Sequence, residues 1–144
     1  MLRVKKQAQK RDVLGFRLPM LTHEVPTLDI TDITVIDPDN TYYMRMGSEA
    51  MTGYQIGMDH ILVIDRSLQP VPGSIVVFFH EGGFYTREYC PQGNKLLLKA
   101  NTKYDTITIE DINQWQCWGV VMLALNPLLQ PQQKVGRYSR VCAC

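Results

Sequence analysis

Seven short segments between residues 41 and 125 are rich in β-branched and aromatic side chains, and this repetition constrains the fold more than any other feature of the sequence. Such residues are typical of strands, and turn-forming residues separate the segments. Glu81-Gly82-Gly83 is short enough to join two of them as a hairpin. No stretch of this region shows strong 3.6-residue periodicity over the length of a helix. We therefore predict a mainly β fold, a compact antiparallel β domain, with strands at 41–46, 60–65, 74–80, 84–89, 95–100, 106–110 and 115–125.

The charge is unevenly distributed along the chain. Residues 1–20 carry six basic side chains and one acidic one, residues 21–125 carry six basic and thirteen acidic ones, and residues 126–144 carry three basic and no acidic ones. We predict an N-terminal arm at 1–40, a β domain at 41–125 and a flexible C-terminal tail at 126–144. Basic ends of this kind contact nucleic acid, another protein or the acidic body, or are simply solvated.

The apolar segments are short. None reaches the roughly 18–20 residues that a membrane span needs, and the N-terminal region lacks the pattern of a secretory signal. We therefore expect a cytoplasmic protein with no membrane partner, whose four cysteines are free thiols. Cys142-Ala143-Cys144 has no second ligand pair and no nearby histidine, so we expect no metal site and no cofactor.

Several segments occur in an order and at spacings that resemble one protein family. The segment 42–51 ends in Gly-Ser-Glu-Ala-Met, and an apolar strand ends in Asp65, fifteen residues after position 50. Over roughly residues 27–125 the chain is similar to the peptidase domain of the LexA/UmuD family of self-cleaving proteins. The resemblance implies a signal-peptidase-like LexA/UmuD C-terminal β domain preceded by an extended N-terminal arm. The matching segments are 42–51, 61–65, 72–77, 81–87, 96–98, 101–109 and 118–121.

The resemblance also implies that the catalytic dyad of the family is degenerate in this chain. The family uses a serine nucleophile and a lysine general base, whose pKa is lowered toward neutrality by burial. Ala50 occupies the position of the serine, and its methyl group cannot attack a peptide bond. Arg87 occupies the position of the lysine, 37 residues later, and its guanidinium, with a pKa above about 12, cannot accept the proton. Either replacement alone would stop the mechanism, so we expect no catalytic residue.

Other candidate nucleophiles are weaker. Ser48 lies two residues from Ala50, roughly 6–7 Å along an extended chain. The family-like spacing from Ala50 to Arg87 argues against a register shifted to Ser48. Thr52 and Cys90 are weaker candidates still.

A departure from the family pattern lies shortly before the strand at 60–65. The family usually has Gly-Asp where this chain has Asp59-His60, so the turn geometry is expected to differ there. We expect His60 to be a turn or surface residue rather than a metal ligand.

The self-cleavage site of the family has no clear counterpart in this chain. Leu14-Gly15 places a glycine 35 residues before Ala50, which suits a degenerate cleavage site with leucine in place of a small residue. The first residues also resemble the start of UmuD itself, and in that alignment about ten residues around the cleavage site are deleted. Both alignments remain open, and each argues against self-cleavage.

The resemblance therefore implies an accessory role rather than chemistry. In the family, a processed UmuD homodimer joins a Y-family catalytic subunit to form an error-prone translesion polymerase, DNA polymerase V, and RecA–DNA filaments trigger processing in the SOS response. We expect a homodimer that binds such a subunit, with the RecA–DNA filament as a further partner and only weak direct contact with nucleic acid. Two alternatives stay open: an autoproteolytic serine peptidase with an unorthodox nucleophile, and a truncated LexA-like regulator that acts through mixed dimers.

Overall fold

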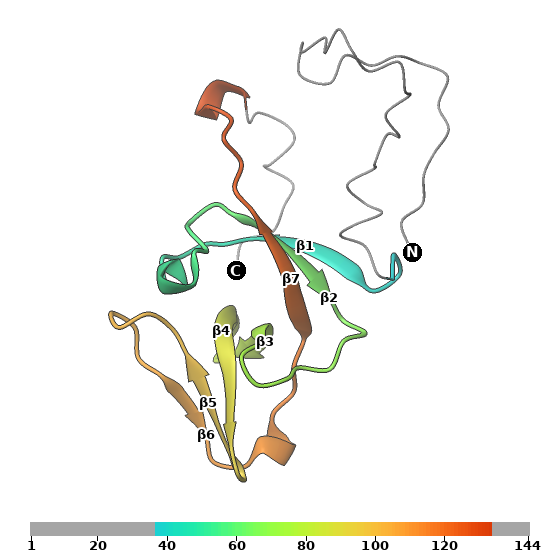
Figure 1. The fold of residues 1–144 in the computed structure, drawn as a ribbon, viewed down its shortest axis with the longest axis vertical. Coiled ribbons are helices and arrows are strands. Elements are labelled where there is room, and N and C mark those ends of the chain that lie inside the picture. Colours follow the sequence, from blue (N-terminus) through green and yellow to red (C-terminus); the bar gives the residue numbers. More distant parts are fainter. Residues whose placement is uncertain (1–36, 134–144) are drawn as a thin grey trace, which may run out of the picture. The chain divides into compact units, whose positions relative to one another are not determined.

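The computed structural model describes residues 37–133 of the chain (Figure 1). These residues include the whole of the predicted β domain and the beginning of the predicted tail. Most of the predicted arm, the expected cleavage site at Leu14 and Gly15, and the Cys142-Ala143-Cys144 motif lie outside the described residues.

Within residues 37–133, seven strands form one sheet in the order β1-β2-β7-β3-β4-β5-β6, and every pairing in it is antiparallel. The predicted mainly β, antiparallel fold is thus confirmed. The first six strands begin within a residue of their predicted positions. The strands are β1 (Thr41–Arg45), β2 (Ile61–Asp65), β3 (Ile75–His80), β4 (Gly83–Gln92), β5 (Lys95–Lys99), β6 (Ile107–Ile109) and β7 (Gly119–Leu125).

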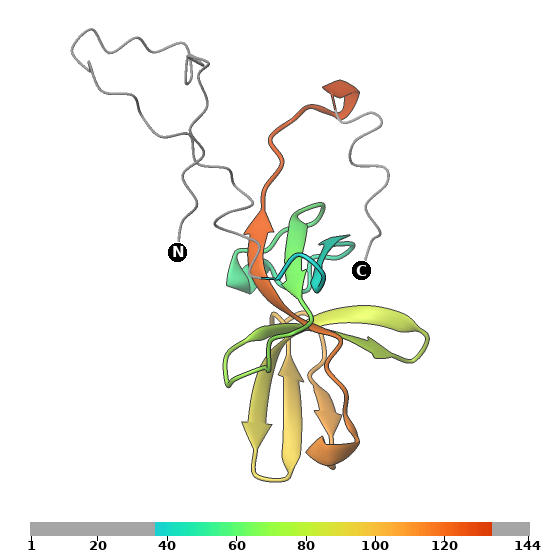
Figure 2. The ribbon, with the colours of Figure 1, turned by 90° about the vertical axis from the view of Figure 1, so that its right-hand side faces the viewer.

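Strand β7 joins two groups of strands. It pairs with β2 along the whole length of that strand, but it pairs with β3 only through Val76↔Val120 and Val77↔Gly119. Figures 1 and 2 show β1, β2 and β7 as one group and β3 to β6 as the other. The sheet is therefore continuous, but a narrow seam connects its two parts.

The strands pack around two hydrophobic cores, and β3 and β7 contribute to both. In β3 successive side chains point to opposite faces, so Val77 packs in the first core while Val76 and Phe78 pack in the second. The first core consists of the buried residues Met44, Met46, Ala50, Met51, Ile56, Leu62, Ile64 and Val77. The second core consists of Val76, Phe78, Leu96, Leu98 and Val120, with aromatic rings packed around them.

The start of β7 was predicted wrongly. We expected a strand over 115–125, but β7 begins at Gly119, and a short 3-10 helix, η3 (Ile112–Gln114), lies before it. The side chain of Asp111 accepts a hydrogen bond from the backbone N–H of Asn113 at 3.0 Å and so caps this turn. The capped turn takes Trp115 out of strand pairing. Two other 3-10 helices are η2 (Thr52–Tyr54) and η4 (Pro131–Gln133).

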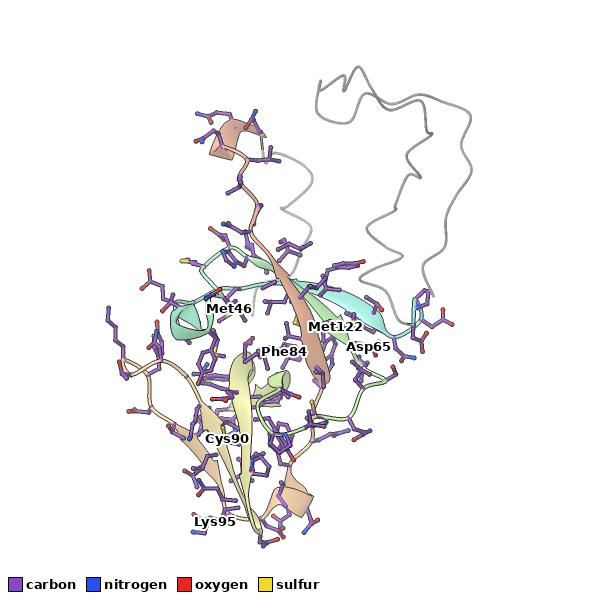
Figure 3. The ribbon with its side chains drawn as sticks, in the orientation of Figure 1. Met46, Asp65, Phe84, Cys90, Lys95 and Met122 are labelled. Atoms are coloured by element: carbon purple, nitrogen blue, oxygen red, sulfur yellow. The ribbon has the colours of Figure 1, made fainter. Side chains whose placement is uncertain are left out.

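Glycine is required where β7 crosses between the two cores. A Cβ atom on Gly119 would lie 2.5 Å from Cγ2 of Ile64, closer than two carbon atoms can approach. Further along β7, Met122 is the extra residue of a β-bulge, because Val63 pairs with Leu123 while Ile64 pairs with Val121 (Figure 3). A bulge bends and twists its strand, which suits a strand that contributes to both cores.

Candidate functional site

The loop between β1 and β2 carries Ala50. Its two ends are held together, since the N–H of Met46 donates to the carbonyl of His60 at 2.8 Å and the N–H of Asp59 donates to the carbonyl of Met46 at 2.8 Å. Ala50 is 1% exposed and Met51 is fully buried, and both pack in the first core. The position that the resemblance assigns to the nucleophile is therefore a methyl group packed in an apolar core.

Asn101 ties this loop to the turn that follows β5. Its backbone N–H donates to the carbonyl of Ala50 at 2.8 Å, and its Nδ2 donates to the carbonyl of Glu49 at 2.7 Å and to Oγ1 of Thr52 at 2.9 Å. Within the loop, the N–H of Ala50 donates to Oγ of Ser48 at 3.4 Å, and the Thr52 hydroxyl donates to the Glu49 carbonyl at 3.1 Å. The hydroxyls of Ser48 and Thr52 thus take part in the loop's own hydrogen bonds.

Arg87 lies in β4 opposite Val76, and it is only 6% exposed. Its Nη1 donates to the carbonyl of Thr86 at 2.8 Å, and its guanidinium carbon lies 5.4 Å from the centre of the Tyr85 ring. Its Nε is buried and has no acceptor among the described residues. Burial lowers the pKa of Arg87, while Tyr85 and Tyr104 act to raise the pKa. A guanidinium keeps its proton at neutral pH even so, and Arg87 is a buried cation rather than a base.

One contact connects the Ala50 loop with the region of Arg87. The hydroxyl of Tyr54, in η2, donates to Oε2 of Glu88 at 2.6 Å. This hydrogen bond, together with burial and the Glu88 charge, raises the pKa of Tyr54 to about 12. The turn that begins at Asn101, which is hydrogen-bonded to the loop, includes Tyr104, and the charge of Tyr104 acts to raise the pKa of Arg87. The structure thus places Ala50 and Arg87 on elements that are bound to each other.

The sequence analysis missed the contact between Tyr54 and Glu88. The two residues are 34 positions apart, and neither belongs to a local pattern that marks a contact. Only the tertiary fold reveals that η2 is fastened to β4.

The two described cysteines are free thiols and are half-buried (Figure 3 labels Cys90). Burial raises the pKa of the Cys90 thiol, and the nearby Glu88 carboxylate raises it further. Burial also raises the pKa of Cys117. A thiol with a raised pKa stays protonated at neutral pH, and the thiolate is the nucleophilic form. The environment of Cys90 therefore does not activate it.

Asp65 is fully buried at the end of β2 (Figure 3). Its Oδ1 accepts hydrogen bonds from the backbone N–H of Ser67 at 2.7 Å and from the Ser67 hydroxyl at 2.5 Å. Its Oδ2 has no donor among the described residues. Asp65 therefore stabilises the turn that leaves β2, which is a structural role.

The turn at Asp59-His60 uses strained backbone. Asp59 has a φ of 65°, a left-handed conformation that favours glycine but that Asp tolerates better than most residues. Nδ1 of His60 accepts a hydrogen bond from the N–H of Gly57 at 3.2 Å, so His60 is a turn residue, as predicted.

Residues 37–133 contain no group of three or more His, Cys, Asp or Glu side chains that could hold a metal ion. In the same part of the chain, no helix is long and apolar enough to cross a membrane.

A row of aromatic rings lies at the surface, and we call it the aromatic stripe: Phe79, Phe84, Trp118 and Tyr42. Successive ring centres are 5.4, 5.5 and 5.3 Å apart, each pair in an edge-to-face arrangement. The guanidinium of Arg66 lies 4.7 Å from the centre of the Trp118 ring. Phe79 is 61% exposed, Tyr42 40% and Phe84 37%. The stripe draws on β1, β3, β4 and the residue before β7, so no single sequence segment revealed it.

Comparison with known proteins finds the Peptidase S24-like family over residues 14–122, which includes both Ala50 and Arg87. Two proteins named Protein MucA, from Salmonella typhimurium and from Escherichia coli, are each 30% identical over 112 residues, which is 77% of this chain and 77% of each relative. Protein SamA from Salmonella typhimurium (strain LT2) is 25% identical over 107 residues, 74% of both chains. The similarity thus covers most of the length of each relative.

Proposed function

The chain belongs to the Peptidase S24-like family, of the LexA/UmuD type, and from this premise we propose that it is a UmuD-like accessory subunit of an error-prone translesion DNA polymerase. It binds a Y-family catalytic subunit as a homodimer, in the cytoplasm, during the SOS response. It does not cleave itself, because its dyad is degenerate.

One observation carries this proposal. The fold of the family is retained, while the nucleophile position is a buried alanine and the base position is a buried arginine. Neither Ala50 nor Arg87 can perform the proton transfer and attack that self-cleavage needs. A scaffold that is intact without its chemistry supports a role that depends on binding surfaces.

The aromatic stripe supports the homodimer. Tyr and Trp are enriched at interface hot spots, and Arg is enriched there as well. The stripe presents Tyr42 and Trp118, and Arg66 lies over the Trp118 ring beside them. An exposed cluster of large rings of this kind marks an interaction surface. We assign it to the contact between two copies of the chain.

Co-purification tests the polymerase partnership. The full chain is immobilised and incubated in parallel with a Y-family catalytic subunit and with a LexA-like repressor from the same cell. We expect the catalytic subunit to be retained. Retention of the repressor alone would support the regulator that acts through mixed dimers and would contradict the accessory role.

Intact mass tests the loss of self-cleavage. The purified chain is incubated with RecA, single-stranded DNA and ATP, and separately at alkaline pH, and is then weighed by mass spectrometry. We expect the mass to stay that of the full chain. A fragment that begins at Gly15 would show that an unorthodox nucleophile cleaves the chain, and it would contradict the proposed loss of self-cleavage.

A further inference from the structure

A cavity of about 480 Å³ lies beside the aromatic stripe, and we call it the aromatic pocket. Phe79 and Trp118 belong to both features. The volume is in the range of pockets that hold small ligands or peptide side chains. The pocket is lined by Arg66, Phe79, His80, Trp115 and Trp118, together with Ile109 and Gln116.

Both indole rings of the pocket are held by neighbouring rings. Trp115 lies 5.7 Å from Phe78 and 5.6 Å from Tyr89, and Trp118 lies 5.5 Å from Phe84, all measured between ring centres. The aromatic walls are therefore formed before any ligand arrives. Grooves lined by such rings bind extended proline-containing segments, which lose little conformational entropy on binding.

The chain itself contains a segment of this chemistry. After β7 it continues as Asn126-Pro127-Leu128-Leu129-Gln130-Pro131, with neither helix nor strand before η4. Leu128 is 83% exposed and Leu129 is 37% exposed. Two leucines between two prolines thus present apolar surface to solvent.

The segment lies away from the pocket of its own copy. Trp118 immediately precedes β7, while the segment follows the other end of that strand, and seven strand residues span roughly 20 Å. Figures 1 and 2 both show the chain continuing beyond β7 away from the group β3 to β6. A second copy is therefore the better source of an occupant.

The segment 127–131 carries no charged side chain, but the tail that follows it differs in charge from the surroundings of the pocket. Glu81 lies beside His80 at 3.8 Å, and Glu110 and Asp111 directly follow Ile109 of the pocket wall. Lys95 offsets one of these carboxylates through its ion pair with Glu110. Residues 126–144 carry three basic side chains and no acidic ones. Arg66, in the pocket wall, offsets a second carboxylate, so these groups leave one net negative charge beside the pocket, while the tail is basic.

We propose that the Pro-Leu-Leu segment at 127–131 of one copy occupies the aromatic pocket of a second copy. In a two-fold dimer the exchange is reciprocal, and each tail fills the pocket of the other copy. The inference rests on the self-association proposed above and specifies how the tail takes part in it.

Tryptophan fluorescence of the full chain is a direct test, because both tryptophans of the sequence line this pocket. We expect the emission to move to shorter wavelength as the protein concentration rises through the dimerisation range. Leu128→Asp is expected to remove that shift, while Gln132→Asp, an equal charge change at an exposed position, is expected to keep it. A shift that Leu128→Asp does not alter would overturn the proposal.

Cross-linking shows which copy supplies the segment. In a cysteine-free background, one chain carries Gln116→Cys at the pocket and a second, differently tagged chain carries Leu128→Cys; Val71→Cys replaces Leu128→Cys as the control. A short bis-maleimide is expected to join the Leu128→Cys pair and not the Val71→Cys pair. Cross-linking only when both cysteines are in one chain would show that each tail fills its own pocket, which overturns the exchange.

Sedimentation of the same samples separates this inference from the proposed function. A dimer whose emission is insensitive to Leu128→Asp overturns the tail exchange and leaves the accessory role standing. A chain that stays monomeric at every concentration overturns the exchange and the proposed homodimer together, whereas binding to the polymerase subunit is decided by the separate co-purification.

Discussion

The surroundings of Ala50 and the aromatic stripe differ in what they expose. Ala50 and Met51 are buried at 1% and 0% exposure, in a loop fastened by Asn101, whereas Phe79 is 61% exposed. A peptidase must present its nucleophile to a substrate, but here that position is closed and lacks the hydroxyl. The large rings of the aromatic stripe are exposed instead. The contrast is between a buried position without its chemistry and an exposed aromatic surface, and it supports the association proposed above.

The largest expected effect concerns the first core, in which Ala50 and Met51 are buried. Met51→Ala removes a fully buried side chain from the first core, and we expect the free energy of unfolding to fall by about 2–5 kcal/mol. Phe79→Ala should change it by no more than about 0.5 kcal/mol, because the ring is mostly in water. Urea unfolding of both variants, at a concentration where the chain is monomeric, measures the difference. Equal losses would mean that the stripe is part of the core.

The next effect concerns the seam between the two cores. Gly119→Ala places a methyl group 2.5 Å from Ile64, and we expect a loss of about 1–3 kcal/mol from overpacking. Gly53→Ala is the matched control, since its Cβ would meet Asn101 at an ordinary 3.6 Å. Thermal and urea unfolding of the two variants make the comparison. A Gly119→Ala variant as stable as Gly53→Ala would show that the structure around Ile64 shifts to make room for the methyl group.

A smaller effect is expected where the Ala50 loop is fastened to β4. Tyr54→Phe removes the hydrogen bond to Glu88, which should cost about 1 kcal/mol at neutral pH. Folding raises the pKa of Tyr54 to about 12 from the ordinary value of about 10. The raised pKa favours the folded state fully below about pH 10, and this contribution is lost as the pH rises from about 10 to about 12.

The measurement for this contact is urea unfolding of the wild-type chain and of Tyr54→Phe at several alkaline pH values. The stability difference between the two should shrink as the pH rises, and subtraction removes the titration of the other tyrosines. A constant difference would show that the Tyr54 hydroxyl does not hold its proton through Glu88.

The last prediction is that restoring the serine alone has no effect on the intact mass of the chain. Ala50→Ser restores the hydroxyl but leaves Arg87 in the place of the base, so we expect the intact mass to stay unchanged in the presence of RecA filaments. The pair Ala50→Ser with Arg87→Lys supplies both groups and is the variant in which cleavage can return. Cleavage by Ala50→Ser alone would show that another group accepts the proton, and would break the contrast between a closed site and an open stripe.

Strand positions were predictable because local conformation follows side-chain type closely in this chain. The late start of β7 has a local cause, the capped turn at Asp111, whereas the end of β4 has a tertiary one. We predicted a strand over 84–89, yet β4 extends through Pro91 to Gln92. Beyond Glu88, β4 no longer pairs with β3, so the N–H that proline lacks is not needed on that side, while Pro91 pairs with Leu96 on the other. The pairing pattern that makes this acceptable is not visible in the sequence around Pro91.

In the candidate site, too, some features were predictable from the sequence and others were not. The identities of Ala50 and Arg87 are properties of single positions, so a family spacing was enough to single them out. The burial of both side chains depends on packing from several strands. The aromatic stripe joins residues as far apart as Tyr42 and Trp118, whose rings meet only after β1 and the approach to β7 come together.

The narrow seam at β7 has a consequence for cooperativity. Val121 and Ala124 pack against the first core and Val120 belongs to the second, so one strand contributes to both. Any sub-global opening that separated the cores would have to break the two residue pairs between β7 and β3. Amide hydrogen exchange at those pairs would therefore report whether the domain opens as one unit or as two.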